Sequence, residues 1–309
     1  MSQSSDLVKA PTFSEVETSF SKLNTAIICH TKWLTEWNIR VICKIPVEAQ
    51  YISEKSHIDC SFGQWLYGEH ANFLRQKPEF SAIKSLHTVV HDKMHAIVNK
   101  ANSGEIITRN EYESFIASEA SFSESLVKLR DELYKLLLSF DYLTGVLNRQ
   151  AFFHILEQEY ARIMRFNEPA CIVLLDIDNF KNINDKYGHD AGDKVLISIA
   201  KFILENMRPY DSICRYGGEE FLICMPKTSV DISHNIIDRI REELSQQKIC
   251  ILEDNYIQVS ASFGIAPISI ENLKDTIVHA DKALYQAKTS GRNKVKVWLD
   301  TKNQMIESV

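Results

Sequence analysis

The sequence predicts a protein of the α + α/β class, with a four-helix bundle followed by a domain in which helices flank a central sheet. The first half of the 309 residues carries apolar residues at helical spacing and shows no strand-like alternation. Beyond Asp141, short apolar runs alternate with helical patterns. The length suits two domains of roughly 150 residues each. We therefore expect a helical domain over residues 1–140 and a second domain over residues 141–309.

Four helices are expected in the first domain. The first ends at Pro46, because proline disfavours helical geometry in the residue before it. A short helix begins near Phe62 and stops before Pro78. Two longer helices cover about residues 81–101 and 110–140. Short connections between four helices favour a bundle.

Strands and helices alternate in the second domain. Cys171–Leu175 is a continuous apolar run, which is typical of a central strand covered on both faces. Residues 257–265 alternate between polar and apolar types and predict another strand. Helices are expected over about residues 192–206, 229–246 and 273–288.

Composition excludes several classes of protein. A net charge of −6 argues against a general binder of nucleic acid or of anionic membranes. Seven cysteines, an odd number in a long chain, fit reduced thiols in the cytoplasm. The segment Met1–Pro11 has no apolar core, so we expect no signal peptide. No apolar run approaches the ~18 residues of a membrane span.

The most informative motif is Gly217–Phe221, which lies between two apolar segments. Two adjacent glycines predict a tight hairpin turn, because both tolerate positive φ. Glu219 and Glu220 would then project from the tip of the hairpin. Paired carboxylates beside bare backbone suit a divalent cation with a phosphate ligand.

A third acid, Asp176, ends the apolar strand. Ligands of α/β proteins gather outside the carboxyl ends of strands. Asp176 and Glu219 on adjacent strands could hold one or two Mg²⁺ ions together with triphosphate oxygens. An acid that merely caps the next turn is the alternative at this position.

Polar residues of two further segments could bind the rest of a nucleotide. Residues 180–193 precede a helix and carry amides and carboxylates that could read a guanine edge. A loop whose Asp193 caps the next helix is the alternative. Lys288 and Arg292 follow the last helix, where they could bind a triphosphate or simply complement the helix dipole.

These motifs resemble, in their order, the GGDEF family of diguanylate cyclases. The segment Asp141–Arg149 (DYLTGVLNR) also matches the opening motif of that family. The resemblance covers Asp141 to about Leu299. It implies a palm-like domain with a mainly antiparallel sheet, and an enzyme that joins two GTP molecules into cyclic di-GMP and releases pyrophosphate. Because each domain holds one GTP, it also implies a homodimer.

The resemblance assigns roles by position. The ligands of Mg²⁺ (or Mn²⁺) would be Asp176, the Ile177 carbonyl, Glu219 and Glu220. Guanine would be bound by Asn184 and Asp193, and phosphates by Lys181, Lys288 and Arg292. Gly217 and Gly218 would let backbone approach the nucleotide. Glu219 departs from the Asp of the family name, but both acids occur there, so an active enzyme is expected.

Arg208 and Asp211 match the RxxD motif that lies before the hairpin in this family. The resemblance implies an inhibitory site there, where the product binds away from catalysis. Arginine offers a planar fork for guanine or phosphate. A surface ion pair is the alternative.

The helical half carries a candidate metal set. His91 and His95 stand four apart on a predicted helix and share one face. With His30 and Cys60 they would make a chemically sound tetrahedral zinc set. Histidines that serve only the core are the alternative.

Residues 14–140 resemble the chemoreceptor zinc-binding (CZB) domain, a four-helix fold with one Cys and three His ligands. The segments that carry the resemblance are His30–Leu34, Cys60–Leu66 and His91–His95. His87 is a second candidate for the third histidine. A zinc domain fused to a cyclase suggests that zinc regulates the enzyme, and inhibition is the expected sign. A purely structural zinc is the alternative.

Three other functions compete with this hypothesis. A GGEEF domain can hold GTP or cyclic di-GMP without turnover, in which case the chain is a sensor or scaffold. A haem or di-iron bundle would also contain histidines, but the carboxylates of a di-iron site are not evident. A dimeric scaffold that recruits partners through its bundle is the third.

Overall fold

The computed structural model describes residues 11–47, 53, 55–68, 74–75, 78–252, 255–269 and 272–298. The chain divides into two compact units, one of residues Pro11–Leu138 and another that begins at Ser139. The segment Met1–Pro11, in which we expected no signal peptide, lies outside the described residues except for Pro11. Within the described ranges, none of the helices combines the length and apolar character that a bilayer crossing needs.

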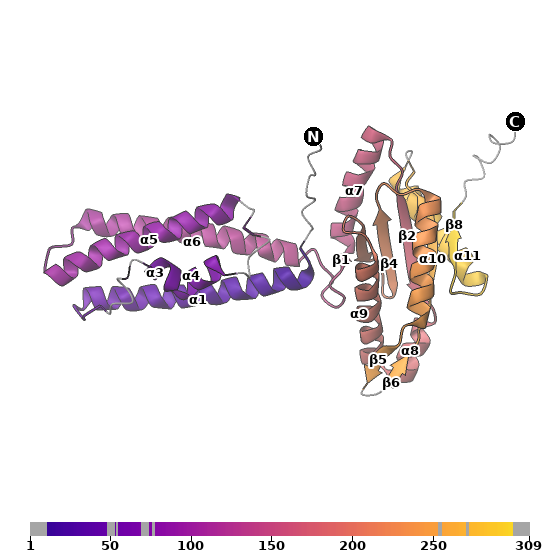
Figure 1. Cartoon of the computed structure of the whole chain (residues 1–309), viewed down its shortest axis with the longest axis horizontal. Coiled ribbons are helices and arrows are strands. Elements are labelled where there is room, and N and C mark those ends of the chain that lie inside the picture. The colour runs from indigo at the N-terminus through magenta and orange to yellow at the C-terminus, as the bar shows by residue number, and fades with distance from the viewer. Residues whose placement is uncertain are drawn as a thin grey trace. The chain divides into compact units, whose positions relative to one another are not determined.

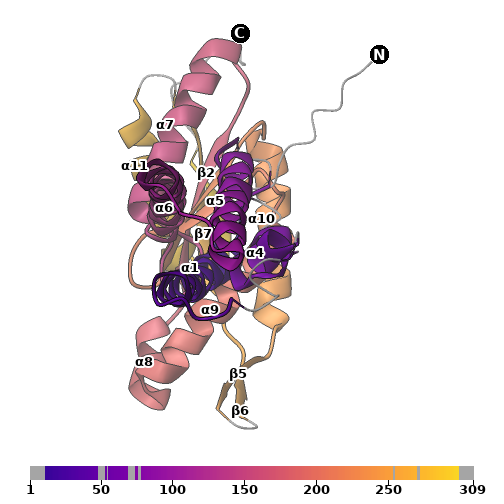
Figure 2. The same ribbon diagram turned by 90° about the vertical axis from the view of Figure 1, so that its left-hand side faces the viewer.

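Three long helices run side by side in the first unit, and Figure 2 views them end-on. They are α1 (Phe13–Ile42), α5 (Pro78–Ser103) and α6 (Arg109–Leu137). The short helix expected near Phe62 is α4 (Ser61–Tyr67), and a further short helix, α3 (Ser56–Asp59), precedes it. Pro78 begins α5, where a missing N–H costs nothing in the first turn.

Local sequence explains where two of the long helices start. Thr12 before α1 and Thr108 before α6 each form a capping box with the glutamate three residues later, Glu15 or Glu111. Large apolar side chains then fill the space between the helices. The fully buried ones include Trp37, Phe62, Phe115 and Phe122.

A six-stranded sheet forms the centre of the second unit (Figure 1). Its order is β1-β3-β4-β2-β7-β8. The inner pairs are antiparallel, whereas β1 pairs with β3 and β8 with β7 in parallel. The strands are Leu147–Asn148 (β1), Cys171–Ile177 (β2), Ser212–Arg215 (β3), Glu220–Met225 (β4), Ala261–Pro267 (β7) and Val295–Val297 (β8). A separate hairpin consists of β5 (Ile249–Leu252) and β6 (Asn255–Ile257).

Helices cover both faces of the sheet. On one face, α7 (Arg149–Phe166) and α11 (Leu273–Thr289) pack on Ile172 and Leu174 of β2. On the other, α9 (His189–Asn206) and α10 (Val230–Gln246) pack on Val173 and Leu175. Alternate residues of β2 therefore enter different cores, which explains its unbroken apolar run.

Some predicted boundaries were wrong. Residues 180–187 form a helix, α8 (Phe180–Tyr187), although its polar composition suggested a loop. The next helix, α9, begins at His189 and not near residue 192, so Asp193 lies inside the helix and does not cap it. The strand expected over residues 257–265 is divided between β6 and β7.

Candidate functional site

Three acids predicted to bind metal meet at one edge of the sheet. The antiparallel register of β2 and β4 places Asp176 opposite Glu220. The amide of Ile177 donates to the Glu219 carbonyl at 3.3 Å, so the end of β2 lies beside the turn before β4. Lys288, in the last turn of α11, places its Nζ 2.7 Å from Asp176 Oδ2.

The pKa values of all three acids at this end of the sheet are raised. Burial, and next the repulsion from Asp176, raise the pKa values of Glu219 and Glu220. Burial also raises the pKa of Asp176, against the opposing effect of Lys288. Each acid is therefore less stable as an anion here than in water. A divalent cation with oxygen ligands fits this donor set.

The glycines of the hairpin do not adopt the positive φ that was expected of them. Neither Gly217 nor Gly218 has positive φ. A Cβ at Gly217 would lie 2.6 Å from Glu220 Oε2, so this glycine makes room for the carboxylate. The surroundings of Gly218 are open, because no other part of the described chain comes within 4 Å of the place that a Cβ would take.

Arg215 holds the turn, and the sequence prediction missed it. Its guanidinium donates to the Gly218 carbonyl at 2.8 and 3.1 Å and lies 3.5 Å from both carboxylate oxygens of Asp141. Asp141 in turn accepts bonds from the amide and hydroxyl of Thr144. An arginine two residues before the glycines was the available signal, because its fork suits a carbonyl and a carboxylate together.

Asp178 forms a second polar centre that the sequence prediction left without a role. This buried carboxylate accepts the hydroxyls of Ser260 and Ser262, each at 2.7 Å, and the Asn293 amide at 2.9 Å. We call these four residues the Asp178 junction. It ties the end of β2 and the start of β7 to the loop after α11.

The loop tied by the junction carries Arg292. Arg292 and Asn293 have φ values of 56° and 46°, a left-handed conformation that costs non-glycine residues about 1 kcal/mol each. The charge of Arg292 acts to lower the pKa of Asp176, so the guanidinium exerts its field on the acidic edge. Lys181, another predicted phosphate ligand, is exposed in the first turn of α8.

Asn184, predicted to bind guanine, lies against the start of α9. Its Oδ1 is buried and has no hydrogen-bond partner among the described residues. A Cβ at Gly192 would overlap this oxygen. Gly192 therefore keeps open the space that the amide needs, and Asp193 follows it as an exposed residue of α9. An unpaired buried oxygen beside an exposed carboxylate suits a ligand edge with N–H donors.

If Asn184 binds the guanine of GTP as predicted, Gly192→Ala should raise the KM for GTP at least about tenfold, because the new methyl group displaces the Asn184 amide. Steady-state kinetics with GTP would measure the change. In a double-mutant cycle, Gly192→Ala should add little to the effect of Asn184→Ala, since both remove the same contact. Fully additive effects would show that Gly192 acts elsewhere.

Arg208 and Asp211, predicted to bind product, form a turn and not a side-chain ion pair. The Arg208 amide donates to Asp211 Oδ2, and the Asp211 amide donates to the Arg208 carbonyl, both at 3.0 Å. The guanidinium lies exposed beside Tyr210, with Nη1 3.1 Å from its hydroxyl. The turn thus presents the guanidinium to solvent.

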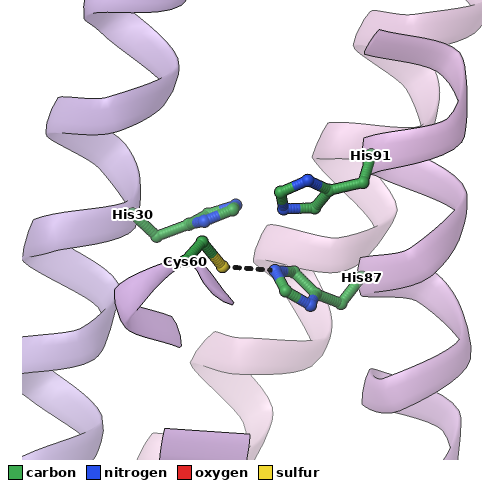
Figure 3. A group of neighbouring side chains, drawn as sticks. All are labelled: His30, Cys60, His87 and His91. Carbon is green, nitrogen blue, oxygen red and sulfur yellow. Dashed lines mark hydrogen bonds between the residues drawn. The ribbon is translucent and has the colours of Figure 1, made fainter. Parts of the chain in front are cut away.

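A second cluster lies inside the helical unit. Figure 3 shows His30 of α1, Cys60 between α3 and α4, and His87 and His91 of α5 pointing toward one another. Their possible ligand atoms all lie within 4.8 Å of each other. Cys60 Sγ is 3.4 Å from His87 Nε2, close to the ~3.5 Å expected between two ligands of one tetrahedral zinc.

The three histidines of the cluster are buried as neutral imidazoles. Burial is the main cause that lowers the pKa of His30 to about 4, of His87 to about 3 and of His91 to about 2. Among the described residues, no partner is found for either nitrogen of His30, for His87 Nδ1 or for His91 Nε2. Such unpaired buried nitrogens are costly, and a soft divalent cation would satisfy them. The donor set therefore fits zinc.

The cluster includes His87 in place of the predicted ligand His95. His95 lies one turn further along α5, where its Nε2 is 2.8 Å from Ser56 Oγ. His87 instead directs Nε2 at Cys60. His87 and His95 are each four residues from His91, so spacing alone does not distinguish them. The position of Cys60, which is next to His87, does.

Cys60 is held by the start of α4. It occupies the N-cap position, and its Sγ accepts the Gly63 amide at 3.2 Å. A Cβ at Gly63 would overlap the His57 carbonyl oxygen, so the close approach of α3 and α4 requires glycine. Burial raises the pKa of Cys60, while the amides of Gly63 and Phe62 oppose this. The Cys-x-x-Gly spacing thus orients the sulfur toward the histidines.

Comparisons with known proteins place the chain among named relatives. Diguanylate cyclase DosC of Escherichia coli K12 is 28% identical over 272 residues, which cover 86% of this chain and 58% of DosC. The chain thus spans a little over half of that relative. Diguanylate cyclase DgcZ of the same strain is 28% identical over 298 residues, covering 94% of this chain and 96% of DgcZ.

Solved structures show the same likeness. The coiled coil and GGDEF domain of DgcB from Caulobacter crescentus, in complex with c-di-GMP, matches 60% of this chain and 99% of that one, with 30% identity and a TM-score of 0.55. Diguanylate cyclase SiaD from Pseudomonas aeruginosa, in complex with its activator SiaC, matches 81% and 95%, with 27% identity and a TM-score of 0.51. The family profile "Diguanylate cyclase, GGDEF domain" matches residues 138–294, just over half of the sequence. The chain belongs to the GGDEF family of diguanylate cyclase domains.

Proposed function

We propose that this protein is a diguanylate cyclase that condenses two GTP molecules into cyclic di-GMP and releases pyrophosphate. The observation that carries the proposal is the meeting of Asp176 and Glu220 across β2 and β4, with Glu219 beside them. The family of the chain and its curated relatives support the same reaction.

In this proposal Mg²⁺ or Mn²⁺ is held by four groups: Asp176, the Ile177 carbonyl, Glu219 and Glu220. The bound ion would neutralise triphosphate charge and stabilise the developing charge on the α-phosphate. Lys288 and Arg292 bind phosphate oxygens from the loop side, and Lys181 does so from the first turn of α8. Gly217 and Gly218 bring bare backbone close to the nucleotide.

Specificity for guanine rests on Asn184 and Asp193. The guanine edge carries N–H donors, which the unpaired Asn184 Oδ1 and the Asp193 carboxylate would accept. Each chain offers one such site, whereas the product needs two GTP molecules joined head to tail. We therefore propose a homodimer in which each 3′-oxygen meets the α-phosphate of the other GTP.

Turnover of GTP tests the enzyme directly. Purified protein with GTP and Mg²⁺ should form cyclic di-GMP and pyrophosphate, as chromatography of the nucleotides would show. The alternative is a domain that binds GTP or cyclic di-GMP without turnover and serves as a sensor or scaffold. GTP left intact by a folded dimer would establish that alternative.

We also propose that Arg208 and Asp211 form a product-inhibition site. The exposed guanidinium supports this, because it remains available for a guanine or phosphate ligand.

Arg208→Ala should weaken inhibition by added cyclic di-GMP by about tenfold or more, since it removes charge-assisted hydrogen bonds. Initial rates measured against product concentration would show the shift. Arg239→Ala, which removes an exposed arginine from α10, is the control, and equal inhibition of both variants would contradict the proposal.

We further propose that His30, Cys60, His87 and His91 bind Zn²⁺ and that zinc inhibits the cyclase. The buried, unpaired nitrogens of the cluster support metal binding. Zinc can regulate the enzyme if its active and inactive conformations bind zinc with different affinity. A zinc that only stabilises the helical unit is the competing function.

We propose a cytoplasmic location as well. All seven cysteines lie outside disulfides, as is usual for proteins of a reducing compartment.

Removal of zinc should raise the rate of cyclic di-GMP synthesis about fivefold or more, the lower end of typical coupling between sites. The assay compares one preparation before and after treatment with a chelator, with metal content measured alongside. Readdition of zinc should restore inhibition. Turnover that stays constant while zinc content falls to zero would leave zinc with a structural role only.

A further inference from the structure

Ser56 links two histidines of α5 inside the helical unit. It lies on α3, is 2% exposed, and places Oγ 3.0 Å from His91 Nδ1 and 2.8 Å from His95 Nε2. His91 and His95 are four residues apart and face the same side of α5. The three side chains thus form a continuous hydrogen-bonded chain that leads away from the metal-ligand cluster.

The direction of the hydrogen bonds follows from which nitrogen is available to a metal. His91 Nε2 is buried and unpaired among the described residues, whereas Nδ1 faces Ser56. A neutral imidazole carries its proton on one nitrogen and a lone pair on the other. Zinc needs the lone pair on Nε2, so Nδ1 must carry the proton and donate it to Ser56 Oγ.

The hydroxyl of Ser56 must then donate elsewhere, and His95 Nε2 is its acceptor. If His95 were absent, the hydroxyl could turn and donate to His91 Nδ1, which would move the imidazole proton to Nε2 and block the metal. His95 therefore fixes the orientation of the hydroxyl, and the hydroxyl fixes the tautomer of His91.

We infer that Ser56 and His95 form an outer shell that holds His91 in its zinc-binding tautomer. His95 is then a positioning residue, one hydrogen bond beyond the ligand that Ser56 contacts. Outer-shell partners of metal-bound histidines typically contribute 10- to 100-fold to metal affinity. The inference rests on the proposed zinc site, and it holds whether zinc regulates the enzyme or only stabilises it.

Zinc affinity tests the inference on the full chain. Competition with a chromophoric chelator should show affinity lowered about 10- to 100-fold in Ser56→Ala. Ser19→Ala is the matched control, because Ser19 is equally buried in the same unit but lies on α1 outside the cluster. Equal zinc affinity of the Ser56→Ala and Ser19→Ala variants would overturn the inference.

A pair of substitutions at His95 separates hydrogen bonding from packing. His95→Gln can keep an acceptor near the position of Nε2 and should retain zinc affinity within about threefold, whereas His95→Leu removes the acceptor and should lose about tenfold. If Ser56→Ala does not fold, this pair still decides the matter. Equal affinities of the Gln and Leu variants would overturn the role of His95.

Nitrogen NMR of the zinc-loaded protein reads the tautomer itself. The Nδ1 proton of His91 should give a protected signal in the wild type and lose that protection in Ser56→Ala. Failure of the wild type to bind zinc would overturn both the site and this inference. Zinc binding with an unprotected Nδ1 proton in the wild type would overturn the inference alone.

Discussion

Replacement of Glu220 by glutamine is expected to leave a folded protein whose cyclic di-GMP synthesis falls at least about a hundredfold. Glu220 lies opposite Asp176 across β2 and β4. The amide keeps the shape of the side chain but supplies no charge to a divalent cation. The measurement is the initial rate of product formation at saturating GTP and Mg²⁺.

The same substitution should cost little stability, which separates lost chemistry from lost fold. Burial, and next the repulsion from Asp176, raise the pKa of Glu220, so a neutral amide removes both a desolvation cost and a repulsion. Glu243→Gln, at an exposed acid paired with Arg239 on α10, is the matched control and should keep full activity. Activity of Glu220→Gln within a few-fold of the wild type would remove Glu220 from the catalytic set.

His87→Leu should reduce zinc affinity on the order of a thousandfold or more, because it removes one of the four proposed ligands. Leucine nearly fills the space of the imidazole among Phe62 and Phe122, so little packing is lost. The zinc content of purified protein, measured against protein concentration, should fall from one per chain to near zero.

His95→Leu provides the comparison that tests the corrected ligand set. It should still bind one zinc per chain at micromolar metal, since His95 lies outside the cluster of four. The reverse outcome, zinc kept without His87 and lost without His95, would restore the ligand set expected from spacing alone.

The acidic edge of the sheet is predictable because its signals are local. An apolar strand that ends in Asp176 and a glycine pair followed by two acids both depend on a few neighbouring residues. The reason for the glycines was wrong, however. A Cβ at Gly217 would meet the end of the Glu220 side chain, a contact that only the folded hairpin reveals.

Features set by distant contacts escaped prediction. Helix α8 is polar in composition, and its one buried residue, Phe180, packs into the core on one side of the sheet. Because most of its residues are polar, the sequence offered little sign that this segment is helical. His87, His91 and His95 share one face of α5 at equal spacing, so sequence could not choose between the outer two. The choice depends on Cys60, which is 27 residues from His87 in the chain.

The Asp178 junction has a consequence for the motions of the enzyme. Its carboxylate gathers the end of β2, the start of β7 and the amide of Asn293 in one buried group of bonds. The loop that carries Arg292 can move only if the Asn293 amide breaks its bond to this buried carboxylate, so the loop is coupled to the core of the sheet. We therefore expect this loop to behave as a rigid wall of the site and not as a lid.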